Sequence, residues 1–310
     1  MLTDKQKEVR DKAIGSSDAP IVAGISTYCS PLELYYKLHG ELPRYDDNET
    51  WEQKAGSKFE PVIAEIVAED LGLKIRRCPT RKHPKYDFMA ASLDYEIVNN
   101  PKGPGILEIK RRSGARFDTL PDDIALQVAH QMAVTNRDWG KVAVLFSWGK
   151  PVVFDVERDK EIEEYLIQLE ARFMVRVKAG DPPTETWTPE TVDLLKKLYP
   201  RDSGKVIELP SEEAVKMVNA FLYYKEQEKV IAGLKAEHEG WLKEQIAGAS
   251  GAKLPGYSIS WKATKDGKTF DEAAFALAHP DLYAQFQKPK PGHRVFRVTP
   301  TKEIACKTLR

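Results

Sequence analysis

The chain has 310 residues, with 42% hydrophobic and 30% charged side chains, and its 47 basic residues balance 47 acidic ones. This length allows one large domain or two smaller ones, and the composition is typical of a soluble globular protein. The sequence has no run of 18 apolar residues, which argues against a membrane span, and its charged N-terminus lacks the apolar segment of a secretory signal. The three cysteines lie far apart, as in proteins of a reducing compartment, and have no zinc-ligand spacing. We therefore expect a cytoplasmic protein.

A net charge of zero argues mildly against a nucleic-acid partner, but the charge is unevenly distributed. Residues 253–310 hold 11 Lys or Arg against 5 Asp or Glu, a net charge of +6, so residues 1–252 carry −6. A basic tail beside an acidic body indicates a local electrostatic footprint, with carboxylates concentrated elsewhere in the chain.

Two helices are predicted in the N-terminal part. The segment SPLELYYKLH, residues 30–39, follows small and turn residues and ends at Gly40. A second helix covers residues 57–71, with Glu60 and Pro61 in its first turn, where an acid and a proline are both favoured. Its apolar residues at helical spacing are Phe59, Ile63, Ile66 and Val67.

Strands and helices then alternate. The sequence predicts strands over 87–98, 105–112, 141–148 and 151–157, and helices over 122–135 and 160–179. The turn-rich NNPKGPG joins the first two strands, and the last two form a hairpin around Gly149 and Lys150. This order indicates a mixed α/β core whose sheet carries helices.

The pattern changes near residue 200, where we place the boundary between domains 1–200 and 201–310. Residues 211–249 predict one long helix, or a helical hairpin broken near Gly233. Two short strands, 257–264 and 293–300, flank a small helix near 271–278.

The strand GILEIKRR carries an unusual pair of charges. Its side chains alternate between two faces, so Glu108 and Lys110 lie on one face with Ile106, while Leu107 and Ile109 lie on the other. Asp94 in the preceding strand would come close to this pair in a hairpin. Two carboxylates and an amine at a strand edge suit a hard cation such as Mg²⁺. The alternative is a solvated strand face, which is the commoner fate of such a triplet.

Two helical segments add polar groups to this region. Gln127 and Gln131 are four residues apart and therefore share a helix face, at the edge of an apolar line. Amides in this position usually have a partner within the fold, so a structural role is about as well supported as a catalytic one. Glu60 is the other candidate, and its alternative role is that of an ordinary first-turn acid.

Together these segments resemble the PD-(D/E)xK nuclease core, in the version of the YqaJ viral recombinase family, the phage exonucleases related to lambda exonuclease. The resemblance covers roughly residues 5–185 and rests on IGSSDAPIVAG with SPLELYYK, GSKFEPVIAE, ASLD, LEIK and QVAHQMAVT, in this order and spacing. It implies a restriction-endonuclease-like α/β fold with a mixed central sheet flanked by helices. Residues 201–310 lie outside this core as an appendage of a long helix and a β-hairpin.

The resemblance also implies roles for individual residues. It assigns metal binding to Asp94, Glu108, Glu60 and the carbonyl of Ile109, catalysis to these acids with Lys110 and Gln127, and the 5′-phosphate of a DNA end to Arg10 and Ser17. Leu93 stands where the motif name has proline, a departure that is frequent in the superfamily.

What the resemblance implies is a magnesium-dependent deoxyribonuclease, with Mn²⁺ as an alternative cofactor, encoded by a phage or prophage and acting in the bacterial cytoplasm. It would digest one strand of linear duplex DNA from 5′ to 3′ and leave 3′ overhangs for recombination by a single-strand annealing partner. The resemblance further suggests a homo-oligomer, a trimeric ring around the DNA.

Two other functions stay open at this point. A structure-specific endonuclease on the same core would have no use for an end-phosphate pocket. A non-catalytic DNA-binding or assembly protein need not keep Asp94, Glu108 and Lys110 together. For residues 253–310, a packed hairpin with solvated charges and an auxiliary DNA contact are both compatible with the sequence, and the long helix also suits subunit assembly.

Overall fold

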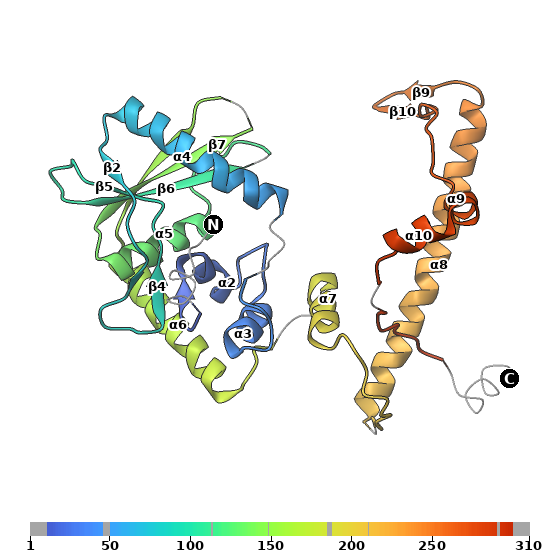
Figure 1. Cartoon of the computed structure of the whole chain (residues 1–310), viewed down its shortest axis with the longest axis horizontal. Helices are drawn as coiled ribbons and strands as arrows, with labels where there is room; N and C mark the ends of the chain where they lie inside the picture. Colours follow the sequence, from blue (N-terminus) through green and yellow to red (C-terminus); the bar gives the residue numbers. More distant parts are fainter. Residues whose placement is uncertain are drawn as a thin grey trace. The chain divides into compact units, whose positions relative to one another are not determined.

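The computed structural model of the chain describes residues 11–45, 50–112, 114–147, 149–184, 188–209, 211–289 and 292–299. The chain divides into two compact units, one ending at Tyr199 and the other beginning at Pro200 (Figure 1). Among the described residues, no helix combines the length and the apolar character that crossing a membrane requires.

The first unit is built on a mixed sheet of five strands in the order β2-β5-β6-β7-β8. The strands are β2 (Ile75–Arg76), β5 (Tyr95–Ile97), β6 (Gly105–Arg112), β7 (Trp139–Phe146) and β8 (Val152–Glu157). The central pair, β6 and β7, is parallel, and the other neighbours are antiparallel. The predicted mixed α/β core is confirmed, as is the hairpin that β7 and β8 form around Gly149 and Lys150.

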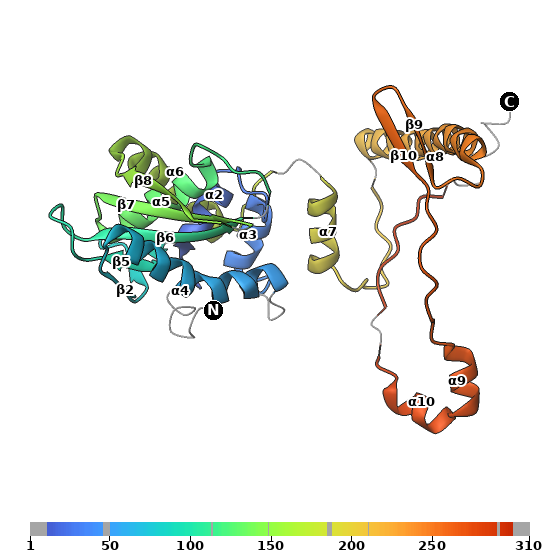
Figure 2. The same cartoon turned by 90° about the horizontal axis from the view of Figure 1, so that it is seen from above.

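One long helix covers each face of this sheet (Figures 1 and 2). On one face, Ile63 and Val67 of α4 (Trp51–Leu71) belong to the same apolar cluster as Leu107 and Ile109 of β6. On the other face, residues of α5 (Asp122–Thr135) pack against Ile106 of β6. Because neighbouring side chains of a strand point in opposite directions, β6 addresses α4 and α5 alternately.

A smaller sheet and further helices complete the first unit. The sheet has the order β1-β4-β3, with β1 (Ile14–Gly15), β4 (Met89–Ala91) and β3 (Arg81–Lys82). After β1 come the short 3₁₀ helix η1 (Ser16–Asp18) and α2 (Ala19–Val22). Helix α2 shares an apolar cluster with α3 (Pro31–His39) and α6 (Lys160–Ala179). Helix α7 (Pro189–Leu198) packs Leu194 against Leu32 and Leu42.

Helix α4 begins earlier than its apolar spacing predicts. The Thr50 hydroxyl accepts a hydrogen bond from the Gln53 amide, and the Gln53 side chain accepts one from the Thr50 amide, so a capping box fixes the start. The placement of Glu60 and Pro61 in the first turn is therefore wrong, because both lie in the middle of the helix. The face of α4 that is buried is also narrower than predicted, because Phe59 is 46% exposed.

The predicted strand over residues 87–98 is two strands in two sheets. It breaks between Ala91 and Tyr95, so that β4 joins the small sheet and β5 joins the large one. The break leaves Asp94 in the connection, immediately before β5, rather than inside a strand. Because Asp94 belongs to neither strand, its side chain can turn toward β6, where the Ile109 amide donates to its carboxylate.

The second unit is dominated by one uninterrupted helix, α8 (Glu212–Ile246), which settles the alternative of a break near Gly233. The strands β9 (Gly251–Leu254) and β10 (Tyr257–Ser260) form a hairpin, and α9 (Glu272–Ala278) and α10 (Pro280–Phe286) follow. The predicted strand at 293–300 is wrong over its described residues, 293–299. The strand that begins at Tyr257, β10, instead pairs with β9. The two-residue turn Pro255–Gly256 joins them, and Gly256 has a φ of +81°.

Candidate active site

The hairpin of β5 and β6 brings Asp94 to the charged strand. Tyr95 pairs with Leu107 in this antiparallel ladder, so Asp94 stands at the level of the next residue of β6, Glu108. The pairing of β5 with β6 ends at Tyr95. The Ile109 amide therefore donates to the Asp94 carboxylate, at 2.8 Å, and not to a backbone carbonyl of β5. Since the N–H and C=O of one residue in an extended strand point to the same side, the Ile109 carbonyl also faces the side of Asp94.

Alternation along β6 separates its charged and apolar side chains as the sequence predicts. Leu107 and Ile109 lie in the core beneath α4, while Glu108 is buried on the opposite face, at 3% exposure. The ammonium of Lys110 lies 2.8 Å from the Glu108 carboxylate on that same face. The charged pair therefore belongs to the interior of a site and is not a solvated strand face.

Two amides of α5 fix the Glu108 carboxylate. The Gln127 side chain donates to Glu108 Oε1 at 2.6 Å and accepts from Lys110 at 2.8 Å. The Gln131 side chain donates to Glu108 Oε2 at 2.8 Å, and also contacts the Ser92 carbonyl at 3.3 Å. Both oxygens of Glu108 are thus oriented by the helix that packs on this face, which explains why two glutamines stand four residues apart.

Burial and neighbouring charges act strongly on Asp94 and Lys110. Burial and the neighbouring Glu108 raise the pKa of Asp94 well above its ordinary value, and Lys110 offsets only part of this effect. Burial tends to lower the pKa of Lys110, but the attraction of Glu108 and Asp94 outweighs it and raises that pKa. Negative charge is therefore in excess at this point, which is the condition that a bound cation relieves.

These groups line a cavity of about 630 Å³ in the first unit. It contains most of the residues singled out from the sequence, namely Asp94, Glu108, Ile109, Lys110, Gln127, Glu60 and Ser17. Ser17 comes from η1 and Glu60 from α4, so separate segments of the chain meet here. Arg10, the proposed companion of Ser17, lies outside the described residues.

The donor set fits a hard divalent cation. Asp94 and Glu108 offer carboxylate oxygens, and the Ile109 carbonyl faces the same side as Asp94. Mg²⁺ accepts such a set because it keeps several of its waters. Glu60 is near enough to raise the pKa of Asp94 but pairs with Arg77 at 3.3 Å. Among the described residues, no three His, Cys, Asp or Glu side chains are grouped closely enough to hold a metal, so Glu60 does not complete the set in this structure.

The residues of this site lie in a segment that matches a known family model. The family model of the YqaJ-like viral recombinase domain matches residues 5–138, which include both carboxylates, Lys110 and both glutamines. This part of the chain is similar to the YqaJ-like viral recombinase domain.

Relatives of this YqaJ-like chain extend the comparison. It is 27% identical to the uncharacterized protein YqaJ of Bacillus subtilis (strain 168), over 93% of this chain and 92% of the relative. Such coverage reaches beyond Tyr199, so the relative shares part of the second unit as well.

Among solved structures, the chain resembles the alkaline exonuclease LHK-Exo from Laribacter hongkongensis. The complex of that protein with dAMP aligns with a TM-score of 0.50 at 16% identity, covering 63% of this chain and 97% of that one. This similarity supports a fold of the PD-(D/E)xK exonuclease type.

The cavity of the YqaJ-like domain also includes residues that sequence reasoning missed. Ser16 of η1, Tyr28 of the loop after α2 and Arg112 at the end of β6 line its wall. Arg112 lies two residues beyond Lys110, and alternation alone places it on the same face. For Tyr28 the sequence gives no signal, because only the fold brings this loop to the cavity.

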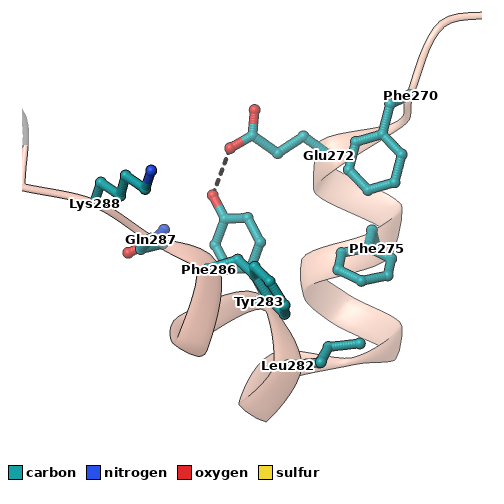
Figure 3. A pocket seen from close by; sticks show the side chains of 8 residues that line it. All are labelled: Phe270, Glu272, Phe275, Leu282, Tyr283, Phe286, Gln287 and Lys288. Carbon is teal, nitrogen blue, oxygen red and sulfur yellow. Dashed lines mark hydrogen bonds between the residues drawn. The ribbon is translucent and has the colours of Figure 1, made fainter.

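A cavity of about 660 Å³ in the second unit has a different character. It lies between α9 and α10 and is lined by Phe270, Glu272, Phe275, Leu282, Tyr283, Phe286, Gln287 and Lys288 (Figure 3). Its one acid, Glu272, accepts a hydrogen bond from the Tyr283 hydroxyl at 2.6 Å. A mainly apolar and aromatic lining with a single carboxylate offers no pair of acids for a cation, so the candidate active site is the cavity of the first unit.

Proposed function

We propose that this chain is a metal-dependent DNA exonuclease that hydrolyses one strand of linear duplex DNA from 5′ to 3′ and leaves a 3′ overhang. One observation carries the proposal: Asp94, Glu108 and Lys110 converge on one wall of a cavity, where the amides of α5 hold the Glu108 carboxylate and the Ile109 amide holds that of Asp94. The solved structure with a similar fold is named an alkaline exonuclease, which supports the same class of reaction.

The cofactor that fits this site is Mg²⁺, with Mn²⁺ as an alternative, and Asp94, Glu108 and the Ile109 carbonyl would hold it. When bound, the cation would supply Lewis-acid stabilisation of the phosphate and would make an attacking water more acidic.

The residues of the chain have separate tasks around the phosphate. Lys110 presents an ammonium that can donate to a phosphate oxygen and stabilise the negative charge that grows during attack. Gln127 bridges Lys110 and Glu108, so it fixes the distance between the positive and the negative partner. The Ile109 amide keeps the Asp94 carboxylate at the open edge of β6.

Ser17 supports the preference for a DNA end. It lies on η1, on the wall of the same cavity as the charged pair. A hydroxyl and nearby backbone amides in this small-residue turn can bind a 5′-phosphate, and the Arg10 guanidinium would add a phosphate fork. A terminal phosphate bound here would bring the first phosphodiester toward Lys110, which is how an exonuclease differs from an internal cutter.

Assembly and partners belong to the same proposal. The resemblance to ring-forming phage exonucleases supports a homo-oligomer, a trimeric ring around the DNA, and a single-strand annealing protein as the recipient of the overhang.

The deciding experiment compares two forms of one duplex. Linear DNA with 5′-phosphate ends and closed-circular DNA of the same sequence are incubated with the protein in Mg²⁺, and then in excess chelator. We expect the linear form alone to be degraded, only in Mg²⁺, with a label at the 5′ end released before one at the 3′ end.

Matched variants connect the activity to the site. Asp94→Asn should abolish degradation, whereas Glu157→Gln, which changes an acid that is 77% exposed on β8, should not. Cleavage of the closed circle would favour an endonuclease, and binding without cleavage in either metal would favour the non-catalytic alternative.

A further inference from the structure

Tyr28 is an exposed aromatic residue on the wall of the candidate active site. Its side chain is 77% exposed, and it lines the cavity that contains Lys110 and Ser17. Exposed aromatic residues are ordinary on loops that face bulk solvent. Here the ring stands beside the charged groups that are proposed to hold a phosphate, so its face is available to whatever enters the cavity.

The position of this ring is fixed despite its exposure. Arg112 donates from Nη1 to the Tyr28 hydroxyl at 2.5 Å and from Nη2 to Asp123 at 2.8 Å. Asp123 belongs to the first turn of α5, the helix that also carries Gln127. Tyr28 is therefore tied through one guanidinium to both β6 and α5, the two elements that build the site. A braced ring loses less conformational entropy when a ligand packs on it.

The spacing along β6 relates Tyr28 to the reaction. Lys110 and Arg112 lie on the same face of the strand, about 6.6 Å apart at the rise of an extended chain. A group that contacts Tyr28 thus lies next to a phosphate held by Lys110. Arg112 occupies the hydroxyl, and its guanidinium carbon lies 5.8 Å from the ring centroid, so what the residue offers a ligand is the ring face turned away from Arg112.

We propose that Tyr28 is a stacking site for a nucleobase of the strand whose phosphate enters the cavity. The proposal rests on the proposed function, because it takes DNA as the occupant. Every base has a π-face, so stacking on a tyrosine ring does not depend on sequence, as a general DNA exonuclease requires. The base concerned is an unpaired one at the 5′ end, since a base inside a duplex has no free face to offer.

The test uses binding without hydrolysis. The probe is a duplex with a three-nucleotide 5′ overhang, phosphorylated at its 5′ end and carrying 2-aminopurine in the overhang, titrated with full-length protein in excess chelator. Stacking on Tyr28 should quench the fluorescence of the 2-aminopurine. Tyr28→Phe keeps the ring and should keep the quench, whereas Tyr28→Leu should lose it and bind the probe about fivefold to 150-fold more weakly.

A matched control removes a tyrosine that is exposed elsewhere. Tyr165 on α6 is 54% exposed and does not line the cavity, so Tyr165→Leu should quench and bind as the parent does. Far-ultraviolet circular dichroism checks that both leucine variants are folded. If Tyr28→Leu quenches and binds like the parent, the stacking site is refuted.

The assay separates this proposal from the proposed function. A protein that does not degrade DNA but shows quenching that depends on Tyr28 would keep the nucleobase site and lose the exonuclease. A protein that degrades linear DNA while Tyr28→Leu quenches normally would lose the site alone.

Discussion

A buried ion pair behind the site allows a quantitative prediction. His130 of α5 and Glu170 of α6 are both fully buried, with Nδ1 of His130 2.8 Å from the Glu170 carboxylate and Nε2 3.0 Å from the Ala90 carbonyl. Two acceptors face the two ring nitrogens, so the pair holds one shared proton in addition to the one on Nε2. Burial tends to lower the pKa of His130, but Glu170 outweighs it and raises that pKa. Burial also raises the pKa of Glu170.

Replacing His130 with alanine should therefore be costly. It leaves the Glu170 carboxylate buried without its donor, and this group must then take up a proton. Protonating a glutamate of ordinary pKa costs about 3.7 kcal/mol at pH 7, within the range of about 3–5 kcal/mol for breaking a buried pair. Glu170→Gln should cost much less, roughly 1 kcal/mol, because the amide can donate to Nδ1 of a neutral imidazole.

Urea unfolding at pH 7 and pH 5 measures these costs. The raised pKa of His130 stabilises the parent fully below about pH 6.5, and this stabilisation is lost as the pH rises through the folded-state value. In His130→Ala, the free energy needed to protonate the buried Glu170 becomes smaller as the pH falls. The difference in the free energy of unfolding between parent and variant should narrow by about 2 kcal/mol from pH 7 to pH 5.

The chain supplies its own control for burial. His39 and Glu41 form a pair at 2.9 Å, nearly the distance of the buried one, but their side chains are 38% and 48% exposed. His39→Ala should cost no more than about 1 kcal/mol at either pH. If His130→Ala costs as little as His39→Ala, or if its cost does not change with pH, the electrostatic reasoning is refuted.

Four further substitutions test the site and its sheet. Glu108→Ala should abolish DNA degradation in Mg²⁺, and Lys110→Ala should reduce turnover strongly while leaving metal affinity largely unchanged, as calorimetry with Mg²⁺ can show. Ser17→Ala should reduce the preference for 5′-phosphorylated over 5′-hydroxyl ends, and equal degradation of both ends by parent and variant would contradict the pocket. Burial tends to raise the pKa of Glu96, but hydrogen bonds from Arg137 and Arg76 lower it, so its stabilisation is lost as the pH falls through the folded-state pKa. Glu96→Gln should flatten the fall of the urea midpoint below about pH 4.5.

The charged face of β6 shows how far sequence reasoning reaches. A period of two separates Glu108 and Lys110 from Leu107 and Ile109 without any knowledge of the fold. The same local logic gives the bounds of α5 and α6. It fails at α4, where spacing alone predicts a late start and the capping box at Thr50 decides. Apolar spacing and capping residues thus predict different starts for α4, and the capping box at Thr50 sets the observed one.

Side-chain contacts between residues far apart in the sequence cannot be predicted from periodicity or capping. Gln131 is predictable as an amide on the same helix face as Gln127, but its contact with Glu108 depends on how α5 crosses β6. His130 is adjacent to it, points to the other side, and meets Glu170 forty residues later in the chain. No periodicity relates the two, because their contact exists only once α6 has packed beside α5.

The same packing explains how the side chains of the site are held in a fixed orientation on β6. β6 alone would leave Glu108 free to rotate, but α5 supplies amides to both of its oxygens. The orientation of α5 is in turn fixed by His130, one residue from Gln131, which ties the helix to Ala90 of β4 and to Glu170 of α6. A buried pair that looks merely structural thus lies one residue away from the groups that orient the proposed metal ligand. Its removal should cost catalytic turnover as well as stability, because a loosened α5 would release the carboxylate that it holds.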